Sequence, residues 1–263
     1  MNLQLNGQHA VVTGSTAGIG YAIAHALVEE GATVTINGRT EQGVQRALQR
    51  LRSDFPSATL HGIVADAATA EGCARLTAGA SIDILVNNMG IFEPKPFDTI
   101  PDEDWQRLFE TNVMSGVRLS RAVLPGMKQR NRGRIVFISS ESGICPPAEM
   151  VHYGMTKSAQ LSIARGIAET CAGTGVTVNS VLPGPTLTEG AKDFLDKLAA
   201  KQGKSFDELV EWFFANARPT SLLRRFIDPK EVAAMVAYVC SPLSAATNGA
   251  ALRVDGGVVR SLI

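Results

Sequence analysis

A serine, a tyrosine and a lysine have the residue types and the spacing for proton transfer. Tyr153 and Lys157 are four residues apart, about one helical turn, so both side chains would project from one helix face. Ser140 lies thirteen residues before the tyrosine. A free phenol has a pKa of about 10 and is a poor acid or base near neutrality, but a fixed cation nearby would lower that pKa. Taken alone, the pair could equally be an ordinary feature of a helix surface.

A glycine-rich turn follows the first strand that the sequence predicts. It runs from Thr13 to Gly20, opens a predicted helix and has the spacing Gly-x3-Gly-x-Gly. Such a turn lets backbone N–H groups approach a pyrophosphate, and the start of the helix favours the negative charge. A glycine turn alone is often only a tight turn. Its place between a strand and a helix favours a nucleotide site.

The end of the second predicted strand bears on which nucleotide binds. An acidic residue there commonly holds the adenosine ribose of NAD, but this chain has Asn37-Gly38-Arg39 and no carboxylate. A guanidinium can pair with a 2′-phosphate. Arg39 therefore predicts NADP(H), with NAD(H) less favoured; the alternative is a solvated arginine in a turn. Exchanging Gly38→Asp together with Arg39→Ala should shift the preference toward NAD.

Short apolar segments alternate with helical patterns along the chain. The predicted strands are 8–13, 33–37, 60–65, 82–87, 134–139, 176–181 and 250–254. The predicted helices are 18–30, 41–53, 69–79, 103–130 (one helix or two), 151–172, 189–216 and 229–240. Several strands are apolar almost throughout, as expected for strands covered on both faces. The order predicts an α/β fold, a Rossmann-type doubly wound parallel sheet of about seven strands with helices on both faces.

No linker, repeat or low-complexity tract divides the chain, so residues 1–263 are predicted to form a single domain. The stretch 186–225 is the least strand-like and holds two amphipathic segments. Ligands bind beyond the carboxyl ends of parallel strands, and this stretch follows such a strand. We therefore expect a flap over the substrate pocket, with core helices as the alternative.

Composition and charge argue against several classes of protein. Lys+Arg and Asp+Glu both number 25, so no basic field favours nucleic acid. The N-terminus lacks a signal-peptide pattern, and no apolar run approaches the roughly 20 residues that span a bilayer. Four scattered cysteines are typical of reduced thiols in a cytoplasmic protein. Four histidines without ligand spacing predict no metal site.

Together, these motifs resemble those of a classical short-chain dehydrogenase/reductase. The glycine turn matches the family's TGxxxGxG motif, and residues 87–90 (NNMG) resemble its NNAG motif, with Met89 in place of alanine. The Pro-Gly pair at 183–184 with Thr188 resembles its PGxxxT element. The family's helix asparagine, serine and YxxxK positions are matched by Asn112, Ser140, Tyr153 and Lys157. The resemblance runs from about residue 5 to the C-terminus, with the motifs in family order.

The resemblance implies a role for each matched side chain. Tyr153 would be the general acid in reduction and the base in oxidation, and Lys157 would bind the nicotinamide ribose and lower the pKa of the tyrosine. Ser140 would orient the substrate carbonyl, and Asn112 would hold a water that relays protons. Ser139 competes for the serine role, but the thirteen-residue spacing to the tyrosine favours Ser140.

The motifs also predict which residues contact the cofactor. They are Gly14, Ser15, Thr16, Gly18, Ile19, Gly20, Asn37, Gly38, Arg39, Asp66, Asn88, Gly90, Tyr153, Lys157, Pro183, Gly184, Thr186 and Thr188. The family further implies a homotetramer or a homodimer.

The leading hypothesis is an NADP-dependent carbonyl reductase or alcohol dehydrogenase acting on CH–OH donors, in the style of 3-oxoacyl-acyl-carrier-protein reductases. Its substrate would be a 3-oxoacyl thioester or another small to medium ketone. The alternatives are a sugar, polyol or steroid alcohol dehydrogenase, and a non-catalytic NADP-binding regulator. Candidate pocket residues are Ile91, Phe92, Glu141, Ser142, Cys145, Met150, His152, Pro185 and Trp212. Neither the substrate nor the direction of reaction follows from the sequence.

Overall fold

The computed structural model describes residues 2–79 and 81–262, and of residues 194, 198 and 200–202 it describes only the backbone. Within these ranges, seven parallel strands form one sheet in the order β3-β2-β1-β4-β5-β6-β7. The strands are β1 (His9–Val12), β2 (Thr33–Gly38), β3 (Leu60–Val64), β4 (Ile84–Asn87), β5 (Gly133–Ile138), β6 (Val176–Pro183) and β7 (Ala251–Val254). The predicted doubly wound sheet and the place of each predicted strand are confirmed.

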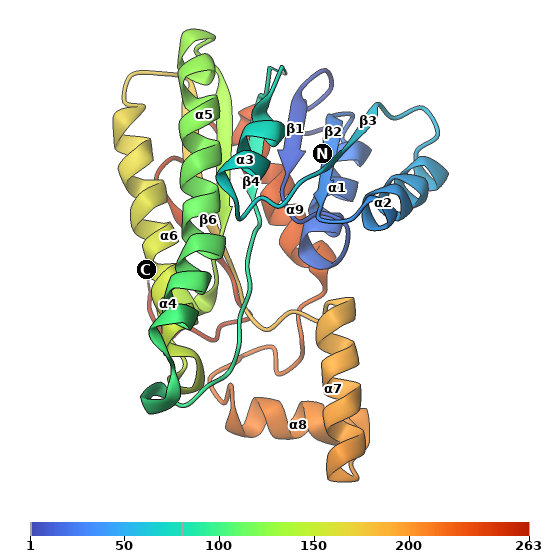
Figure 1. Cartoon of the computed structure of the whole chain (residues 1–263), viewed down its shortest axis with the longest axis vertical. Coiled ribbons are helices and arrows are strands. Elements are labelled where there is room, and N and C mark those ends of the chain that lie inside the picture. Colours follow the sequence, from blue (N-terminus) through green and yellow to red (C-terminus); the bar gives the residue numbers. More distant parts are fainter. Residues whose placement is uncertain (1, 80, 263) are drawn as a thin grey trace.

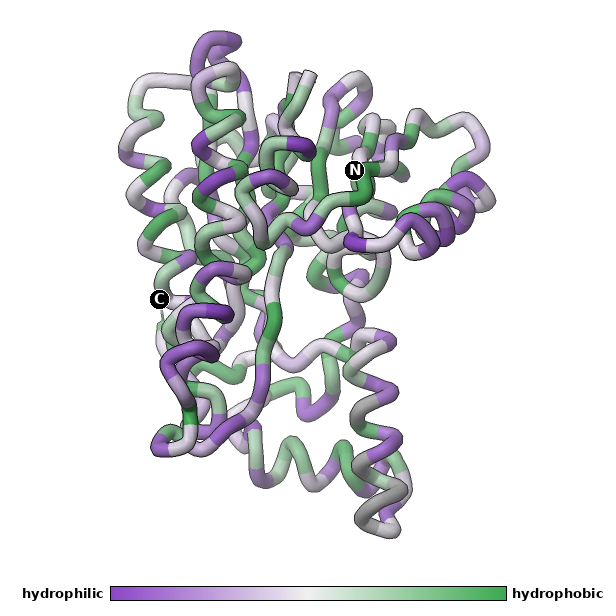
Figure 2. The backbone as a smooth tube through the Cα atoms, in the orientation of Figure 1, coloured by the Kyte–Doolittle hydropathy of each residue, from purple (hydrophilic) through white to green (hydrophobic). Residues whose placement is uncertain are grey.

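Helices cover both faces of the sheet (Figure 1). One face carries α1 (Gly18–Glu29), α2 (Glu41–Asp54) and α9 (Pro229–Cys240), and the other carries α3 (Ala70–Thr77), α5 (Ser115–Gln129) and α6 (Val151–Thr170). Each face has its own apolar core, and the strands β5 and β6, which are buried along their whole length, contribute to both. The backbone is hydrophobic through the sheet, whereas α2 is largely hydrophilic (Figure 2) and buries only its inner side.

The strand order reverses between β1 and β4. In an open parallel sheet, the loops that leave neighbouring strands at such a reversal diverge, and this leaves a crevice at the carboxyl ends. The glycine turn after β1 and residues 88–91 after β4 both begin at this edge. The fold thus places the two loops that carry nucleotide motifs next to one another.

The segment 103–130 forms two α-helices joined by a wider turn. α4 (Asp102–Phe109) is followed by a turn of π-helix, η2 (Glu110–Met114), and α5 then begins at Ser115. Single π-helical turns inside α-helices often occur at functional sites. Asn112 lies in the middle of this turn and is buried.

The segment 189–216, predicted as one helical stretch, is two helices. α7 (Glu189–Gln202) ends before Gly203, whose φ of +64° is a conformation that favours glycine. α8 (Phe206–Asn216) begins with a capping box in which Ser205 and Glu208 satisfy each other's backbone N–H groups. Leu195, Ala199 and Leu209 form a small separate cluster. In Figure 1 both helices project away from the end of the sheet at which β6 ends.

Candidate active site

The end of β5 and the first turns of α6 position the candidate catalytic side chains. Ser140 is the second residue after this strand and is in extended conformation. It caps a short 3-10 turn, because its Oγ accepts a hydrogen bond from the Ser142 backbone N–H at 3.1 Å. Tyr153 and Lys157 lie one turn apart on α6. Ser140 is hydrogen-bonded to Tyr153, and the Lys157 Nζ atom lies 5.6 Å from the centroid of the tyrosine ring. The structure therefore brings the three residues together.

The two adjacent serines point to different partners. The Ser139 hydroxyl donates to the main-chain carbonyl oxygen of Lys157 at 2.8 Å, so it ties β5 to α6. The Ser140 hydroxyl donates to Glu141 Oε2 at 2.5 Å and also contacts Tyr153. Of the two, only Ser140 contacts Tyr153, and its role toward a substrate carbonyl stays a prediction.

Lys157 is enclosed by the protein. Its side chain is 3% exposed, and its Nζ donates to the Ile138 carbonyl oxygen at 2.9 Å and to Gln160 Oε1 at 3.2 Å. Burial lowers the pKa of the ammonium to about 7, while the Glu141 carboxylate acts in the opposite direction. At neutral pH the amine is therefore close to its midpoint between charged and neutral forms.

Lys157 is not among the groups that shift the pKa of Tyr153 in this structure, so its predicted lowering of that pKa stays a prediction. Burial raises the pKa of Tyr153, and the Glu141 carboxylate raises it further; the hydrogen bond with Ser140 and the Arg218 guanidinium act in the opposite direction. The tyrosine is partly exposed. A phenolate there would lose hydration, which is the main cause of the shift.

Asn112 links three elements through its side chain. Its Oδ1 accepts from the Ile91 N–H at 2.8 Å, and its Nδ2 donates to the Ile91 carbonyl oxygen and to Thr156 Oγ1. The side-chain amide of Gln160 bridges the site: its Nε2 donates to the Asn112 carbonyl oxygen at 2.6 Å and its Oε1 accepts from Lys157. A water relay at Asn112 stays a prediction.

Gln160 is a site residue that the sequence reasoning missed. It is 1% exposed and sits three residues after Lys157 on the same face of α6. A polar residue at that helical spacing from a functional lysine was the available signal.

The glycine turn and the ends of β2 and β3 enclose a cavity of about 480 Å³. Gly14 has a φ of +59°, and a Cβ on Gly20 would lie 2.4 Å from the Gly14 carbonyl oxygen, so the turn needs both glycines. Eight predicted cofactor contacts line the cavity: Gly14, Thr16, Asn37, Gly38, Arg39, Asp66, Asn88 and Gly90. Arg39 is exposed and makes no hydrogen bond or ion pair within the described part of the chain. A glycine turn at a helix start beside an unpaired guanidinium fits a phosphate-bearing dinucleotide.

The other predicted cofactor residues do not line this cavity. They are Ser15, Gly18, Ile19, Gly20, Tyr153, Lys157, Pro183, Gly184, Thr186 and Thr188. Ser15 is buried, with its hydroxyl donating to the Val12 carbonyl oxygen and accepting from the Asn37 N–H, so it joins β1 to β2. Thr188 lies against the glycine turn, because a Cβ on Gly18 would come within 3.2 Å of its Cγ2.

Two of the candidate pocket residues, Glu141 and His152, lie in different surroundings. Glu141 is buried beside Ser140 and Arg218, inside the site. His152 is fully buried on the other side of α6, with its ring 5.8 Å from that of Trp105 on α4. Burial lowers the pKa of His152. Consecutive helical residues project about 100° apart, so His152 cannot share the direction of Tyr153.

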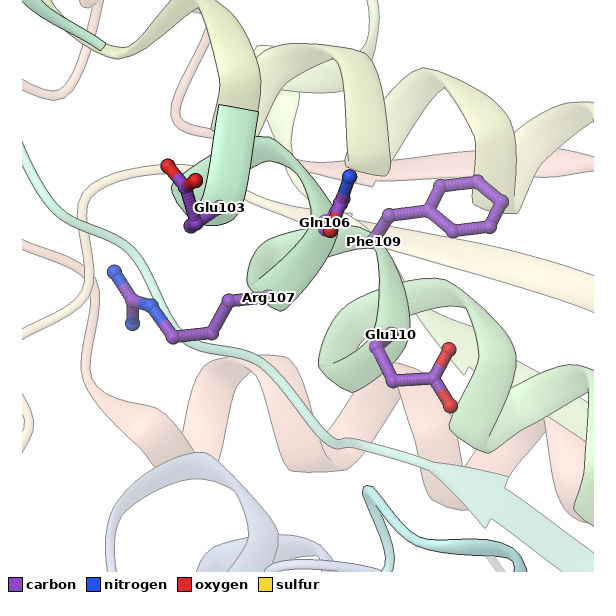
Figure 3. A pocket seen from close by; sticks show the side chains of 5 residues that line it. All are labelled: Glu103, Gln106, Arg107, Phe109 and Glu110. Carbon is purple, nitrogen blue, oxygen red and sulfur yellow. The ribbon is translucent and has the colours of Figure 1, made fainter. Parts of the chain in front are cut away.

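A further hollow lies on the surface of α4 and η2 (Figure 3). Its lining residues are Glu103, Gln106, Arg107, Phe109 and Glu110, all from one continuous helical run. Arg107 is held there by Glu93 and Asp104 at 2.8 and 2.9 Å. None of the catalytic candidates lines this hollow, so we place the active site between Ser140, Tyr153 and the glycine-turn cavity.

In the part of the chain that the structure describes, no helix has the length and apolar character to cross a bilayer. Over the same residues, no three His, Cys, Asp or Glu side chains gather as a metal site.

A parallel sheet with a glycine turn at the strand reversal, beside a Ser–Tyr–Lys group, defines an oxidoreductase of Rossmann type. Residues 8–199 match the family model of the short chain dehydrogenases. The chain belongs to this family.

Relatives match over essentially the whole chain. It is 50% identical over 263 residues to an uncharacterized oxidoreductase, YvaG, of Bacillus subtilis, covering 100% of both chains. It is 32% identical to the 3-oxoacyl-acyl-carrier-protein reductase FabG of Vibrio cholerae, covering 97% of this chain and 99% of the relative. The structure of L-sorbose reductase from Gluconobacter frateurii, complexed with NADPH and L-sorbose, superimposes with a TM-score of 0.93 at 30% identity, covering 100% of both chains.

Proposed function

We propose that this protein is an NADP(H)-dependent reductase that transfers a hydride between the cofactor and a ketone or secondary alcohol. The observation that carries the proposal is the contact of Ser140 with Tyr153, one helical turn from Lys157. The glycine-turn cavity with the exposed Arg39 at its edge supports a phosphorylated dinucleotide. The NADPH complex of the related L-sorbose reductase supports the same cofactor.

The chain's own residues would bind the cofactor, orient the substrate and protonate its carbonyl oxygen. When bound, the cofactor supplies the hydride. Tyr153 would donate a proton to the carbonyl oxygen, and because burial raises its pKa, the tyrosine keeps that proton at neutral pH. Ser140 would hydrogen-bond the same oxygen. Lys157, with a pKa of about 7, can hold ribose hydroxyls either as a donor or as an acceptor.

Arg39 and the glycine turn would hold the adenosine end of the cofactor. The turn offers backbone N–H groups at the start of α1, and Arg39 offers a fork of donors to a 2′-phosphate. Thr188 would close over the turn from the segment after β6, because it already lies against Gly18.

For the substrate we favour a polar ketone over a long acyl thioester. Glu141 and Arg218 place two charged groups beside Tyr153, and such groups pair better with hydroxyls than with an acyl chain. The L-sorbose complex of a structural relative supports this choice, whereas the 3-oxoacyl reductase relative keeps the thioester as the second candidate. A flap at 186–225, a homotetramer or homodimer and a cytoplasmic location stay predictions.

The experiment is NADPH oxidation, with NADH in parallel, against a ketose, a β-ketoacyl thioester, a cyclic ketone and a steroid ketone. Turnover of the ketose with NADPH supports the proposal, and a thioester preference would move the substrate to the second candidate. Tyr153→Phe is the matched control, since it removes only the hydroxyl. NADPH binding without turnover of any ketone would favour a non-catalytic regulator instead.

A further inference from the structure

The serine of the site has a carboxylate as its immediate neighbour. Glu141 is 6% exposed, and its Oε2 accepts the Ser140 hydroxyl proton at 2.5 Å. Ser140 Oγ accepts from the Ser142 N–H on its other side. A serine hydroxyl has one proton to give. With that proton on Glu141, Ser140 has none left for the oxygen of a substrate carbonyl.

An arginine from the segment after α8 compensates the buried carboxylate. Arg218 Nε lies 3.4 Å from Glu141 Oε1, and its Nη1 lies 3.2 Å from Glu149 Oε1. The Arg218 side chain is 12% exposed. A buried carboxylate is tolerated when a cation and hydrogen bonds accompany it. Glu141 is therefore held between Arg218 and the Ser140 hydroxyl.

Reduction of a ketone needs the opposite arrangement at Ser140. Its proton has to turn from Glu141 to the carbonyl oxygen, and this leaves a buried carboxylate oxygen without a donor, which is costly. A substrate that brings its own donor to Glu141 avoids that cost. A hydroxyl on the carbon next to the carbonyl is placed for this, because Ser140 Oγ and Glu141 Oε2 are themselves adjacent.

We propose that Glu141 is a specificity-determining residue that selects α-hydroxyketones. The substrate hydroxyl donates to Glu141 Oε2, and the Ser140 proton is released to the neighbouring carbonyl oxygen. Arg218 pairs with the other oxygen of the same carboxylate and orients it. This inference rests on the proposed function and adds the substrate class to it.

The test compares a hydroxyketone with the same ketone lacking the hydroxyl. We would measure kcat/KM with NADPH for 1-hydroxy-2-butanone and for 2-butanone. The wild type should prefer the hydroxyketone by roughly 10- to 100-fold, as expected for one hydrogen bond to a charged group. Glu141→Gln should reduce the preference to about threefold or less, because kcat/KM for the hydroxyketone falls while that for 2-butanone does not. A purely structural defect would lower kcat/KM for both ketones alike and leave their ratio unchanged.

Two further variants and a binding measurement complete the design. Glu149→Gln removes the other carboxylate of Arg218, which does not contact Ser140, so the ratio should stay at its wild-type value. Arg218→Gln should lower the ratio, and it decides the matter if Glu141→Gln does not fold. In NADPH-loaded Tyr153→Phe, which cannot turn over, the hydroxyketone should raise the melting temperature more than 2-butanone does.

The outcomes separate the two proposals. Equal kcat/KM of the wild type for both ketones, or a hydroxyketone preference that survives in Glu141→Gln, overturns the role of Glu141 and leaves the reductase function intact. No NADPH oxidation with any ketone overturns the reductase function and the inference with it.

Discussion

Ser139 is hydrogen-bonded through its hydroxyl to the main-chain carbonyl oxygen of Lys157, at 2.8 Å. The next residue, Ser140, uses its hydroxyl on Glu141 and Tyr153 instead. The two neighbouring serines after β5 thus have different hydrogen-bond partners. One ties the strand to α6 and the other enters the active site.

Exchanging each serine for alanine should separate these two contributions. Ser140→Ala should lower kcat/KM for ketone reduction by roughly 100-fold, because a hydrogen-bond donor to the developing oxyanion is lost. Ser139→Ala should cost about 1 kcal/mol of unfolding free energy, since it removes a buried hydrogen bond between β5 and α6, with a much smaller effect on catalysis. Steady-state kinetics and thermal unfolding measure the two effects. Equal kinetic losses in both variants would contradict the assignment of Ser140.

Arg39 is expected to select the phosphorylated cofactor. Arg39→Ala should raise the KM for NADPH roughly 10- to 100-fold and leave that for NADH nearly unchanged, because only NADPH carries the 2′-phosphate. The control is Arg52→Ala, which removes an exposed arginine in the last turn of α2. An unchanged ratio of the two KM values in Arg39→Ala would mean that the arginine is only solvated.

The double exchange of Gly38→Asp with Arg39→Ala shows a limit of reasoning from sequence. A Cβ on Gly38 would lie 2.5 Å from Thr16 Cγ2, so an aspartate there needs Thr16 to move. The single arginine exchange is therefore the cleaner test of cofactor preference. The motif indicated which positions matter, but not which of them have room for a side chain.

Local patterns predicted the layout of the site, because they depend on neighbours in the chain. Helical spacing placed Tyr153 and Lys157 together, and the strand–turn–helix order located the glycine turn. The electrostatics could not be predicted in this way. The pKa of Tyr153 depends on Arg218, which pairs with Glu141 from 77 residues away in sequence, and on a burial that only the packed fold creates. Ser15 was predicted as a cofactor contact from its motif alone, but its hydroxyl joins two strands.

Gln160 is expected to position the lysine of the site. Gln160→Leu keeps the size of the side chain but removes its hydrogen bonds to Lys157 and to the Asn112 carbonyl oxygen. We expect kcat to fall roughly 10-fold with KM little changed, and the pKa of Lys157 to drop further, because the ammonium loses an acceptor. The pH profile of kcat measures that shift. A profile identical to that of the wild type would show that Gln160 only fills space.

Lys157 should make the stability of the cofactor-free protein depend on pH. Its pKa is about 7 in the folded protein and about 10.4 in an unfolded chain. Below pH 7 both states carry the proton, and the folded state bears the full cost of a buried ammonium. Between pH 7 and pH 10 the unfolded state holds a proton that the folded state has lost, so this contribution to the free energy of unfolding rises with pH.

Lys157→Met removes that charge while keeping much of the side-chain volume. It should stabilise the cofactor-free protein by roughly 1–3 kcal/mol at pH 6, and the gain should shrink steadily toward pH 10. Denaturant unfolding at several pH values measures the stabilisation at pH 6 and its decrease toward pH 10. The control is Lys230→Met, because Lys230 is an exposed lysine at the start of α9. A stability difference that stays constant from pH 6 to pH 10 would show that the lysine titrates alike in both states. The same exchange should abolish ketone reduction, so stability and activity would change in opposite directions at one residue.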